Sequence, residues 1–329
     1  MTRLDSDVSA VVLTVGEATT PAAIGSVEAQ TLPAREIVLV EHVTPFSRAL
    51  NEGASRVVTP FFVQVDADMI LDPICFETLR RNMTPGVGQV SGFLRDRLLG
   101  RICCIKMFRT ACLQQCPMPD TVAADVDFLH GITDLGWCLV IALRFDRPRD
   151  EWHTYAEHRR DYSPQYTFHK FQLEGRKARY RRDTFGFKDR LMRLHRRPQD
   201  VTVVAQIGLA HGVFNQDTGD GLRPFGESAE WRRLEAFLSA DGGGRRVPVL
   251  RPTGDAKEIF RAAYRLGIEL GAAQDASGFR CELRALGEAS SAWGWIAQVG
   301  LCHGLFATDY GEDLFEDRFR LLSELLHAG

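Results

Sequence analysis

The sequence predicts an α/β fold, with a Rossmann-like, mostly parallel sheet flanked by helices and a mainly helical C-terminal region. Short apolar runs rich in β-branched residues alternate with helix-like segments in the first part of the chain. One of these runs ends in two carboxylates, and long helical patterns replace the alternation from about residue 188. We therefore expect two domains, residues 1–187 and residues 188–329.

Three apolar runs near the N-terminus have the composition of strands that are buried on both faces. They cover residues 8–14, 36–40 and 61–65. Residues 22–32 and 47–57, which lie between them, carry small and apolar side chains at helical spacing. Strands and helices that alternate in this way form right-handed crossovers and a parallel sheet. Residues 87–93 and 137–143 are two further strand candidates.

Polar side chains follow each of the first three predicted strands, within residues 14–17, 41–44 and 66–68. Ligands of parallel sheets bind beyond the carboxyl ends of the strands. Placing Asp66 and Asp68 side by side costs Coulomb and desolvation energy unless a positive partner offsets it. Carboxylate oxygens suit Mn²⁺ or Mg²⁺, so a metal site is the first prediction. The alternative is a solvated pair at the start of a helix near Pro73, for which Asp72 is the better cap.

The composition is that of a soluble protein: 329 residues, 45% apolar, with a formal net charge of −3. This charge argues against a general nucleic-acid binder. Residues 159–197, however, hold thirteen Lys/Arg against four Asp/Glu. This basic stretch could be a solvated face, a phosphate-binding surface or a surface attracted to anionic lipid. The sequence lacks a run long enough to span a membrane and the features of a signal peptide, which predicts a cytoplasmic protein, peripheral to the membrane at most.

The eight cysteines lie mostly in apolar runs and form no CxxC pair, so we expect buried, reduced thiols and no zinc site. The C-terminal region holds an internal repeat. AQIGLAHGVF at residues 205–214 and AQVGLCHGLF at residues 297–306 are identical at seven of ten positions. His211 and His303 could carry chemistry. The favoured interpretation is structural: the small residues let the two helices pack on each other or on a common neighbour, with both histidines hydrogen-bonded in the interface.

Several segments in order resemble the family 2 glycosyltransferases of GT-A fold. They are VSAVVLTVGEATTPAAIGSVEAQTLPAREIVLVEH, RALNEGASRVVTPFFVQVDADMILDP and ADVDFLHGITDLGW, within about the first 185 residues. The most specific part is an apolar strand followed by Ser26, Gln30, Pro33 and Glu36, then by Asn51 and Gly53, and then by DAD. The resemblance implies inverting, divalent-metal-dependent transfer of a sugar from a UDP- or GDP-type donor to a glycan, lipid-linked or small-molecule acceptor, with surface glycan synthesis as a family-level expectation.

The same resemblance implies roles for single residues at the metal. Asp68 would ligate Mn²⁺ or Mg²⁺, and Asp66 would contact the ribose or the metal. His158 would complete the metal site, with His153 as the alternative. Arg159, Arg160 and Lys170 in the basic stretch could bind phosphate oxygens.

The resemblance also implies a base and a donor-binding loop. Asp125 would be the general base, although Ala124 stands where the family commonly has Glu; Asp127 could serve instead, or Asp125 could cap its helix. Glu41 would contact the nucleobase. Thr14 and Glu17 would lie in the donor-binding loop, where Gly16 could allow the backbone to approach the ligand.

Two other functions compete with this one. A catalytically impaired GT-A-like binding or assembly subunit is compatible with the missing acid before Asp125 and with the repeat, which could also form a homo-oligomer interface. A haloacid-dehalogenase-type phosphatase would use the DxD pair and the later Gly219-Asp220-Gly221. It fits less well because its nucleophile usually ends the first strand, whereas two strand candidates precede Asp66 here.

Overall fold

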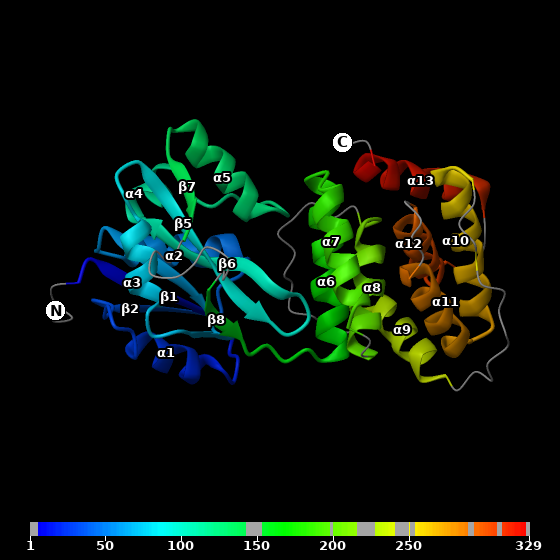
Figure 1. Ribbon diagram of the computed structural model, residues 1–329, viewed down its shortest axis with the longest axis horizontal. Helices are drawn as coiled ribbons and strands as arrows, with labels where there is room; N and C mark the ends of the chain where they lie inside the picture. The colour runs from blue at the N-terminus through cyan, green and yellow to red at the C-terminus, as the bar shows by residue number, and fades with distance from the viewer. Residues whose placement is uncertain are drawn as a thin grey trace. The chain divides into compact units, whose positions relative to one another are not determined.

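The computed structural model describes residues 6–142, 153–197, 200–215, 228–240, 250, 254–288, 293–307 and 311–326. Contacts divide the chain into two compact units, one up to Asp161 and one from Tyr162 onward (Figure 1). The predicted boundary at residue 187 falls inside a helix of the second unit. The first unit ends earlier because the basic stretch forms helices that pack within the helical unit.

The first unit is built on a mixed sheet, which among the described residues has eight strands in the order β2-β1-β3-β6-β5-β8-β4, with β7 beside β5. The strands are β1 (Val8–Thr14), β2 (Ile37–Glu41), β3 (Phe61–Asp66), β4 (Met69–Leu71), β5 (Val87–Asp96), β6 (Gly100–Arg109), β7 (Cys138–Ile141) and β8 (Thr154–His158). Strand β1 pairs in parallel with β2 and β3, and β5 pairs in parallel with β7 and β8. The β3–β6, β5–β6 and β4–β8 pairs are antiparallel. The mostly parallel α/β fold is therefore confirmed.

Helices cover both faces of this sheet. One core lies under α1 (Thr20–Glu28) and α3 (Cys75–Asn82). The other lies under α2 (Phe46–Arg56), α4 (Thr110–Gln115) and α5 (Ala124–Asp134). Residues of β1 alternate between the two cores, as the pleat of a doubly covered strand requires. Helix α2 lies close on the sheet because Gly53 has no side chain: a Cβ there would be 2.3 Å from Val11 Cγ1.

The five predicted strands exist, although residue 143 lies outside the described residues. The short strands β4 and β8 and the long strand β6 were not predicted. In β6 the apolar pattern is broken by Arg101 and Lys106, so the sequence shows no continuous hydrophobic run. The expectation of buried cysteines is wrong for Cys103, Cys138 and Cys281, which are exposed, although all eight thiols are free. Apolar neighbours in the sequence do not determine which face of an element a side chain occupies.

The second unit is helical and duplicated over most of its length. Its helices are α6 (Pro164–Tyr180), α7 (Thr184–His195), α8 (Asp200–Gly212), α9 (Ala229–Ser239), α10 (Ala256–Ala272), α11 (Ala276–Glu288), α12 (Gly294–Gly304) and α13 (Glu312–Leu326). Helices α6 and α10 begin and end 92 residues apart, and this is also the spacing of the two repeat histidines. The first turns of α7 and α11 repeat as well, since Asp183 and Asp275 each accept a hydrogen bond from a glycine three residues later. The ten-residue repeat is thus part of a larger duplication.

Small residues of the repeat allow close helix crossings. A Cβ at Gly208 of α8 would lie 2.4 Å from the carbonyl oxygen of Phe168 on α6. A Cβ at Gly304 of α12 would lie 2.3 Å from the carbonyl oxygen of Tyr264 on α10. Helices α8 and α12 also contact each other, and His211 Nδ1 lies 3.0 Å from His303 Nδ1. The packing role predicted for the repeat is confirmed.

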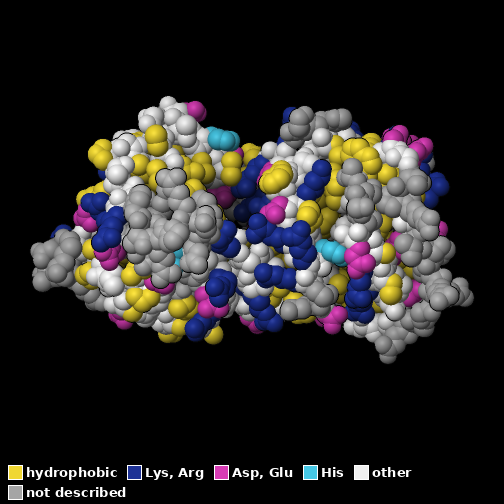
Figure 2. Space-filling view, viewed as in Figure 1, with side chains coloured by type: hydrophobic (Ala, Val, Ile, Leu, Met, Phe, Trp, Pro, Cys, Tyr) yellow, Lys and Arg dark blue, Asp and Glu magenta, His cyan; other side chains and the backbone are white. Residues whose placement is uncertain are grey.

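The basic stretch forms α6 and α7, over which Lys and Arg side chains gather on the surface (Figure 2). Part of this charge is neutralised internally by Glu174, which lies 3.4 Å from Lys170, 3.8 Å from Lys177 and 3.6 Å from Arg190. Although burial opposes ionisation, these cations hold the pKa of Glu174 well below its ordinary value. Within the described part of the chain, every helix is too short or too polar to cross a bilayer.

Candidate metal centre and active site

Asp66 and Asp68 lie where β3 ends and the chain turns into β4. Ala67 between them donates its backbone N–H to Leu13 O of β1, at 3.0 Å. Strand β4 pairs with β8 so that Met69 lies opposite His158. This register brings His158 beside Asp68 although the two are far apart in sequence. One ligand atom from each of Asp66, Asp68 and His158 lies within 4.8 Å of the others.

Two atoms of this group are buried without hydrogen bonds. Asp68 Oδ1 and His158 Nε2 lie 3.9 Å apart, and neither has a hydrogen-bond partner among the described residues. Leaving a buried polar atom without a partner costs about 1–3 kcal/mol. A divalent cation between them would satisfy both atoms, and carboxylate oxygen with imidazole nitrogen suits Mn²⁺. The residues present therefore fit the predicted metal.

Asp96, at the end of β5, orients His158. Its Oδ2 atom lies 3.0 Å from His158 Nδ1, and its Oδ1 atom accepts from the N–H groups of Leu98 and Leu99, each at 2.8 Å. Burial disfavours the imidazolium, but hydrogen bonds with Asp96 and Cys104 outweigh it and raise the pKa of His158 to about 9. Histidines that bind a metal through one ring nitrogen usually have the other nitrogen hydrogen-bonded to a carboxylate. Asp96 contacts His158 Nδ1 in this way and leaves Nε2 to face a cation.

Asp66 is held by its strand neighbour. Gln64 Nε2 donates to Asp66 Oδ1 at 2.8 Å. Burial and the nearby charge of Asp68 nevertheless raise the pKa of Asp66 above its ordinary value. A cation would offset this repulsion, so the electrostatics of the pair favour the same occupant as its geometry.

The basic residues predicted to bind phosphate have three different positions. Arg160 Nε lies 2.6 Å from Asp68 Oδ2, so this guanidinium is part of the metal group. Arg159 is exposed, and its backbone N–H donates to Asp68 O at 2.7 Å. Lys170 belongs to the helical unit, where it pairs with Glu174. The structure thus brings Arg160 and Arg159 to the carboxylates and does not place Lys170 in this unit.

Asp125 lies at the start of α5, with its Oδ2 atom 3.9 Å from Lys106 Nζ. Lys106 of β6 is the register partner of Gln64 on β3. Directly opposed residues project to the same side of a sheet, so Asp125 lies over the face that carries Gln64 and Asp66. Asp127 instead accepts a hydrogen bond from the Thr121 hydroxyl. Of the two acids, Asp125 is the one tied to the strand beside the metal group.

The loop after β1 is closed by its own hydrogen bonds. The hydroxyl of the buried Thr14 donates to Glu17 Oε2 at 2.7 Å, and Val15 N donates to the same oxygen at 2.8 Å. Gly16 has a φ of +104°, and a Cβ there would lie 3.2 Å from His42 Cε1. The glycine thus makes room for His42. Glu41 is exposed at the carboxyl end of β2, on the edge where the other strand-end residues gather.

His153 does not join the metal group, since its Nε2 lies 3.4 Å from Asp72 Oδ2. Asp72 also accepts a hydrogen bond from the N–H of Ile74 before α3, as expected of a cap. Sequence reasoning missed Gln64, Asp96 and Lys106. Of these, only Asp96 carries a recognisable signal: it follows the strand candidate at residues 87–93, as Asp66 follows its own strand.

Neither a family model nor a curated protein matches the sequence. Among solved structures, the chain is similar to a mannosyltransferase from Pyrobaculum calidifontis in complex with GDP-Man and Mn²⁺. The two are 13% identical, the match covers 90% of this chain and 86% of the mannosyltransferase chain, and the TM-score is 0.39. The crystal structure of S. aureus TarS 1–349 is 12% identical, covers 91% of this chain and 90% of its own, and has a TM-score of 0.31. These are similarities of chain architecture; the functional proposal rests on the side chains at the carboxyl edge of the sheet.

Proposed function

We propose that this protein is a divalent-metal-dependent glycosyltransferase that moves a sugar from a nucleoside-diphosphate donor to an acceptor hydroxyl. The observation that carries the proposal is the convergence of Asp66, Asp68 and His158, with two buried ligand atoms that have no hydrogen-bond partner in the described part of the chain. Within the predicted α/β scaffold, this group stands at the sheet edge where such folds bind ligands. UDP- and GDP-type donors are both compatible with it.

In this reaction the leaving diphosphate gains negative charge as the bond to the sugar breaks. Asp68, Asp66 and His158 would hold Mn²⁺ or Mg²⁺, which supplies electrostatic stabilisation of that charge when bound. Arg160, beside Asp68, and the exposed Arg159 would add cationic side chains near the phosphates. Thr14, Glu17 and Glu41 would line the donor side at the ends of β1 and β2.

The acceptor hydroxyl must lose a proton as it attacks. We assign this proton to the carboxylate of Asp125, whose side chain is 34% exposed and therefore accessible to an acceptor. Inversion follows if the acceptor attacks from the face opposite the leaving group. Lys106 Nζ, 3.9 Å from Asp125 Oδ2, would help to hold this carboxylate in place.

Mn²⁺ binding tests the metal centre. In the full-length protein, calorimetric titration should show saturable Mn²⁺ binding that Asp68→Ala abolishes. Asp134→Ala, which removes an exposed carboxylate at the end of α5, should leave the affinity unchanged. No Mn²⁺ binding by the parent protein, or equal affinity in Asp68→Ala, would overturn the proposal.

Turnover separates an enzyme from a binding subunit. Release of nucleoside diphosphate should be measured over UDP- and GDP-sugars with Mn²⁺ and candidate acceptors. Asp125→Asn should lower the rate by about 10²–10⁴-fold while donor binding persists, because a general base acts on the chemical step. Metal-dependent donor binding without turnover in the parent protein would favour the binding or assembly subunit. The motif Gly219-Asp220-Gly221 that a phosphatase would need lies outside the described residues.

A further inference from the structure

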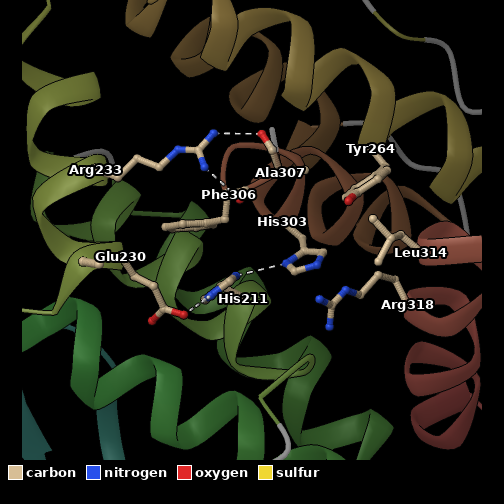
Figure 3. A pocket seen from close by; sticks show the side chains of 10 residues that line it. His211, Glu230, Arg233, Tyr264, His303, Phe306, Ala307, Leu314 and Arg318 are labelled. Carbon is tan, nitrogen blue, oxygen red and sulfur yellow. Dashed lines mark hydrogen bonds and ion pairs between the residues drawn. The ribbon is translucent and has the colours of Figure 1, made fainter. Parts of the chain in front are cut away.

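The helical unit contains a cavity of about 400 Å³ where the two halves of the duplication meet. His211 and Glu230 line it from the first half, and Tyr264, His303 and Arg318 line it from the second (Figure 3). The volume is within the range of small-molecule sites. The cavity belongs wholly to the helical unit, so it is separate from the metal group.

The two halves contribute to this cavity reciprocally. Phe306 of the second half stacks on His211 at 4.0 Å between ring centroids, and Phe214 of the first half stacks on His303 at 3.8 Å. The helices that follow the repeat, α9 in the first half and α13 in the second, each place an aromatic residue against the first helix of their half. Trp231 of α9 lies 6.1 Å from Phe168, and Phe319 of α13 lies 6.1 Å from Phe260, which is the 92-residue counterpart of Phe168.

Glu230 directly precedes Trp231, and Arg318 directly precedes Phe319; Phe315 of α13 also packs on Phe260, at 5.7 Å. Glu230 is satisfied: its Oε1 atom lies 3.2 Å from His211 Nε2, and its Oε2 atom accepts from Gln172 Nε2 at 2.9 Å. The hydrogen bond with His211 lowers the pKa of Glu230 to about 2, so it is a carboxylate at neutral pH. The first half of the duplication therefore supplies its own carboxylate, Glu230, as the partner of His211.

The other half places a cation, Arg318, near its own histidine, His303. Figure 3 shows the guanidinium of Arg318 beside the ring of His303, on the side away from His211. Arg318 makes no ion pair with any residue that the structure describes, and His303 Nε2 has no hydrogen-bond partner among the same residues. His303 is only 5% exposed, and burial together with nearby His211 and Arg318 keeps its pKa well below the ordinary value. The guanidinium of Arg318 thus faces a cavity in which Glu230, the one carboxylate among the described lining residues, already pairs with His211 and Gln172.

We propose that this cavity binds a small molecule through an anionic group, a phosphate or a carboxylate, which pairs with Arg318. The guanidinium offers a planar pair of donors that either group can accept bidentately. Glu230 repels a second anionic group, so the charged end of the ligand is directed to the Arg318 side. Stacked aromatic rings and Leu314 provide the apolar remainder of the wall.

Inorganic phosphate and acetate are suitable probes, with chloride at matched ionic strength as the reference. Binding to the full-length protein, followed by calorimetric titration, should be weakened about 10- to 100-fold by Arg318→Leu, the range for loss of a charge-assisted hydrogen bond. Arg320→Leu, on the same helix but paired with exposed Asp317 and Glu324, should bind as the parent does. Asp68→Ala should also bind normally, because the metal group is not involved.

A phosphate-only response assigns a phosphorylated ligand, and an acetate-only response assigns a carboxylate. If Arg318→Leu fails to fold, Glu230→Gln provides the second test. It removes the repelling charge but keeps the side-chain shape, and should strengthen anion binding. The proposal is overturned if neither probe binds the parent protein, if Arg318→Leu binds both probes as tightly as the parent, or if Glu230→Gln weakens binding.

Discussion

The candidate site residues of the first unit depend on neighbouring side chains that fix their orientation. His158 presents Nε2 to the carboxylates because Asp96 holds its other nitrogen at 3.0 Å. Arg160 contacts Oδ2 of Asp68, whereas His158 lies beside Oδ1. Among the described residues, Asp68 Oδ1 and His158 Nε2 have no hydrogen-bond partner, a desolvation cost that a cation would relieve.

Asp96 is a positioning residue, and Asp96→Asn tests this. The amide can still accept from Leu98 and Leu99, but it no longer carries the charge that increases the basicity of His158 as a ligand. We expect the Mn²⁺ affinity to fall about 10- to 100-fold, measured by calorimetric titration. Asp72→Asn, which alters a nearby cap outside the metal group, is the matched control. Unchanged Mn²⁺ affinity in Asp96→Asn would contradict this role.

The sequence identified the metal group because its signals are local. Asp66 and Asp68 follow a buried apolar run, and His158 stands at the start of a basic stretch. Gln64 and Lys106 could not be found in this way. Their relation to Asp66 and Asp125 depends on the pairing of β3 with β6, and the charged residues of β6 hide that strand from its hydrophobic pattern.

At the scale of elements, helix crossings in the second unit depend on glycines whose missing side chains admit a neighbouring backbone. Gly175 and Gly208 do this between α6 and α8, and Gly267 and Gly304 do it between α10 and α12. Packing through backbone contact requires a small residue at one position per turn of contact. This need explains why both copies of the repeat keep their two glycines.

Gly208→Ala should destabilise the helical unit by about 1–3 kcal/mol, the usual cost of overpacking. The new methyl group would lie 2.4 Å from a backbone oxygen, which cannot move without separating the helices. In Gly271→Ala the same change meets only ordinary contacts at 3.6 Å, so the better helix propensity of alanine should stabilise by up to about 1 kcal/mol. Chemical denaturation of both variants measures the difference. Equal effects of the two substitutions would contradict this account of the crossings.

The ends of most predicted elements agree with the observed ones within a few residues, but the larger duplication was visible only in ten residues. Outside that segment the halves keep only scattered identical residues, such as Phe168 with Phe260 and Asp183 with Asp275. Gln172 corresponds to Tyr264, for example, and the two have different chemistry at the same place around the histidines. Identities this sparse are hard to recognise when the two stretches of sequence are compared.

At the scale of the whole molecule, each unit has its own core and its own proposed ligand. The sheet is covered on both faces by its own helices, and the helical unit closes around its duplicated halves. Compact units of this kind can unfold separately.

Scanning calorimetry of the full-length protein should therefore resolve two transitions. Mn²⁺ at 100 times its dissociation constant should stabilise the transition of the sheet unit by about 2.7 kcal/mol and leave the other unchanged. The shift should be absent in Asp68→Ala, whereas Gly208→Ala should lower only the transition that Mn²⁺ does not move. A single transition that Mn²⁺ shifts as a whole would show that the units unfold together.

The meeting of His211 with His303 has a further consequence. Two identical subunits related by a two-fold axis carry the same residue at both equivalent positions. If the two halves were separate subunits of a homodimer, the position beside each histidine would therefore hold two acidic residues or two basic residues. Joining both copies in one chain removes this restriction. Here one half supplies an acid, Glu230, that satisfies its own histidine, while the other half supplies a basic residue, Arg318, to the cavity. Covalent linkage thus allows the two halves of a duplicated scaffold to carry different charges.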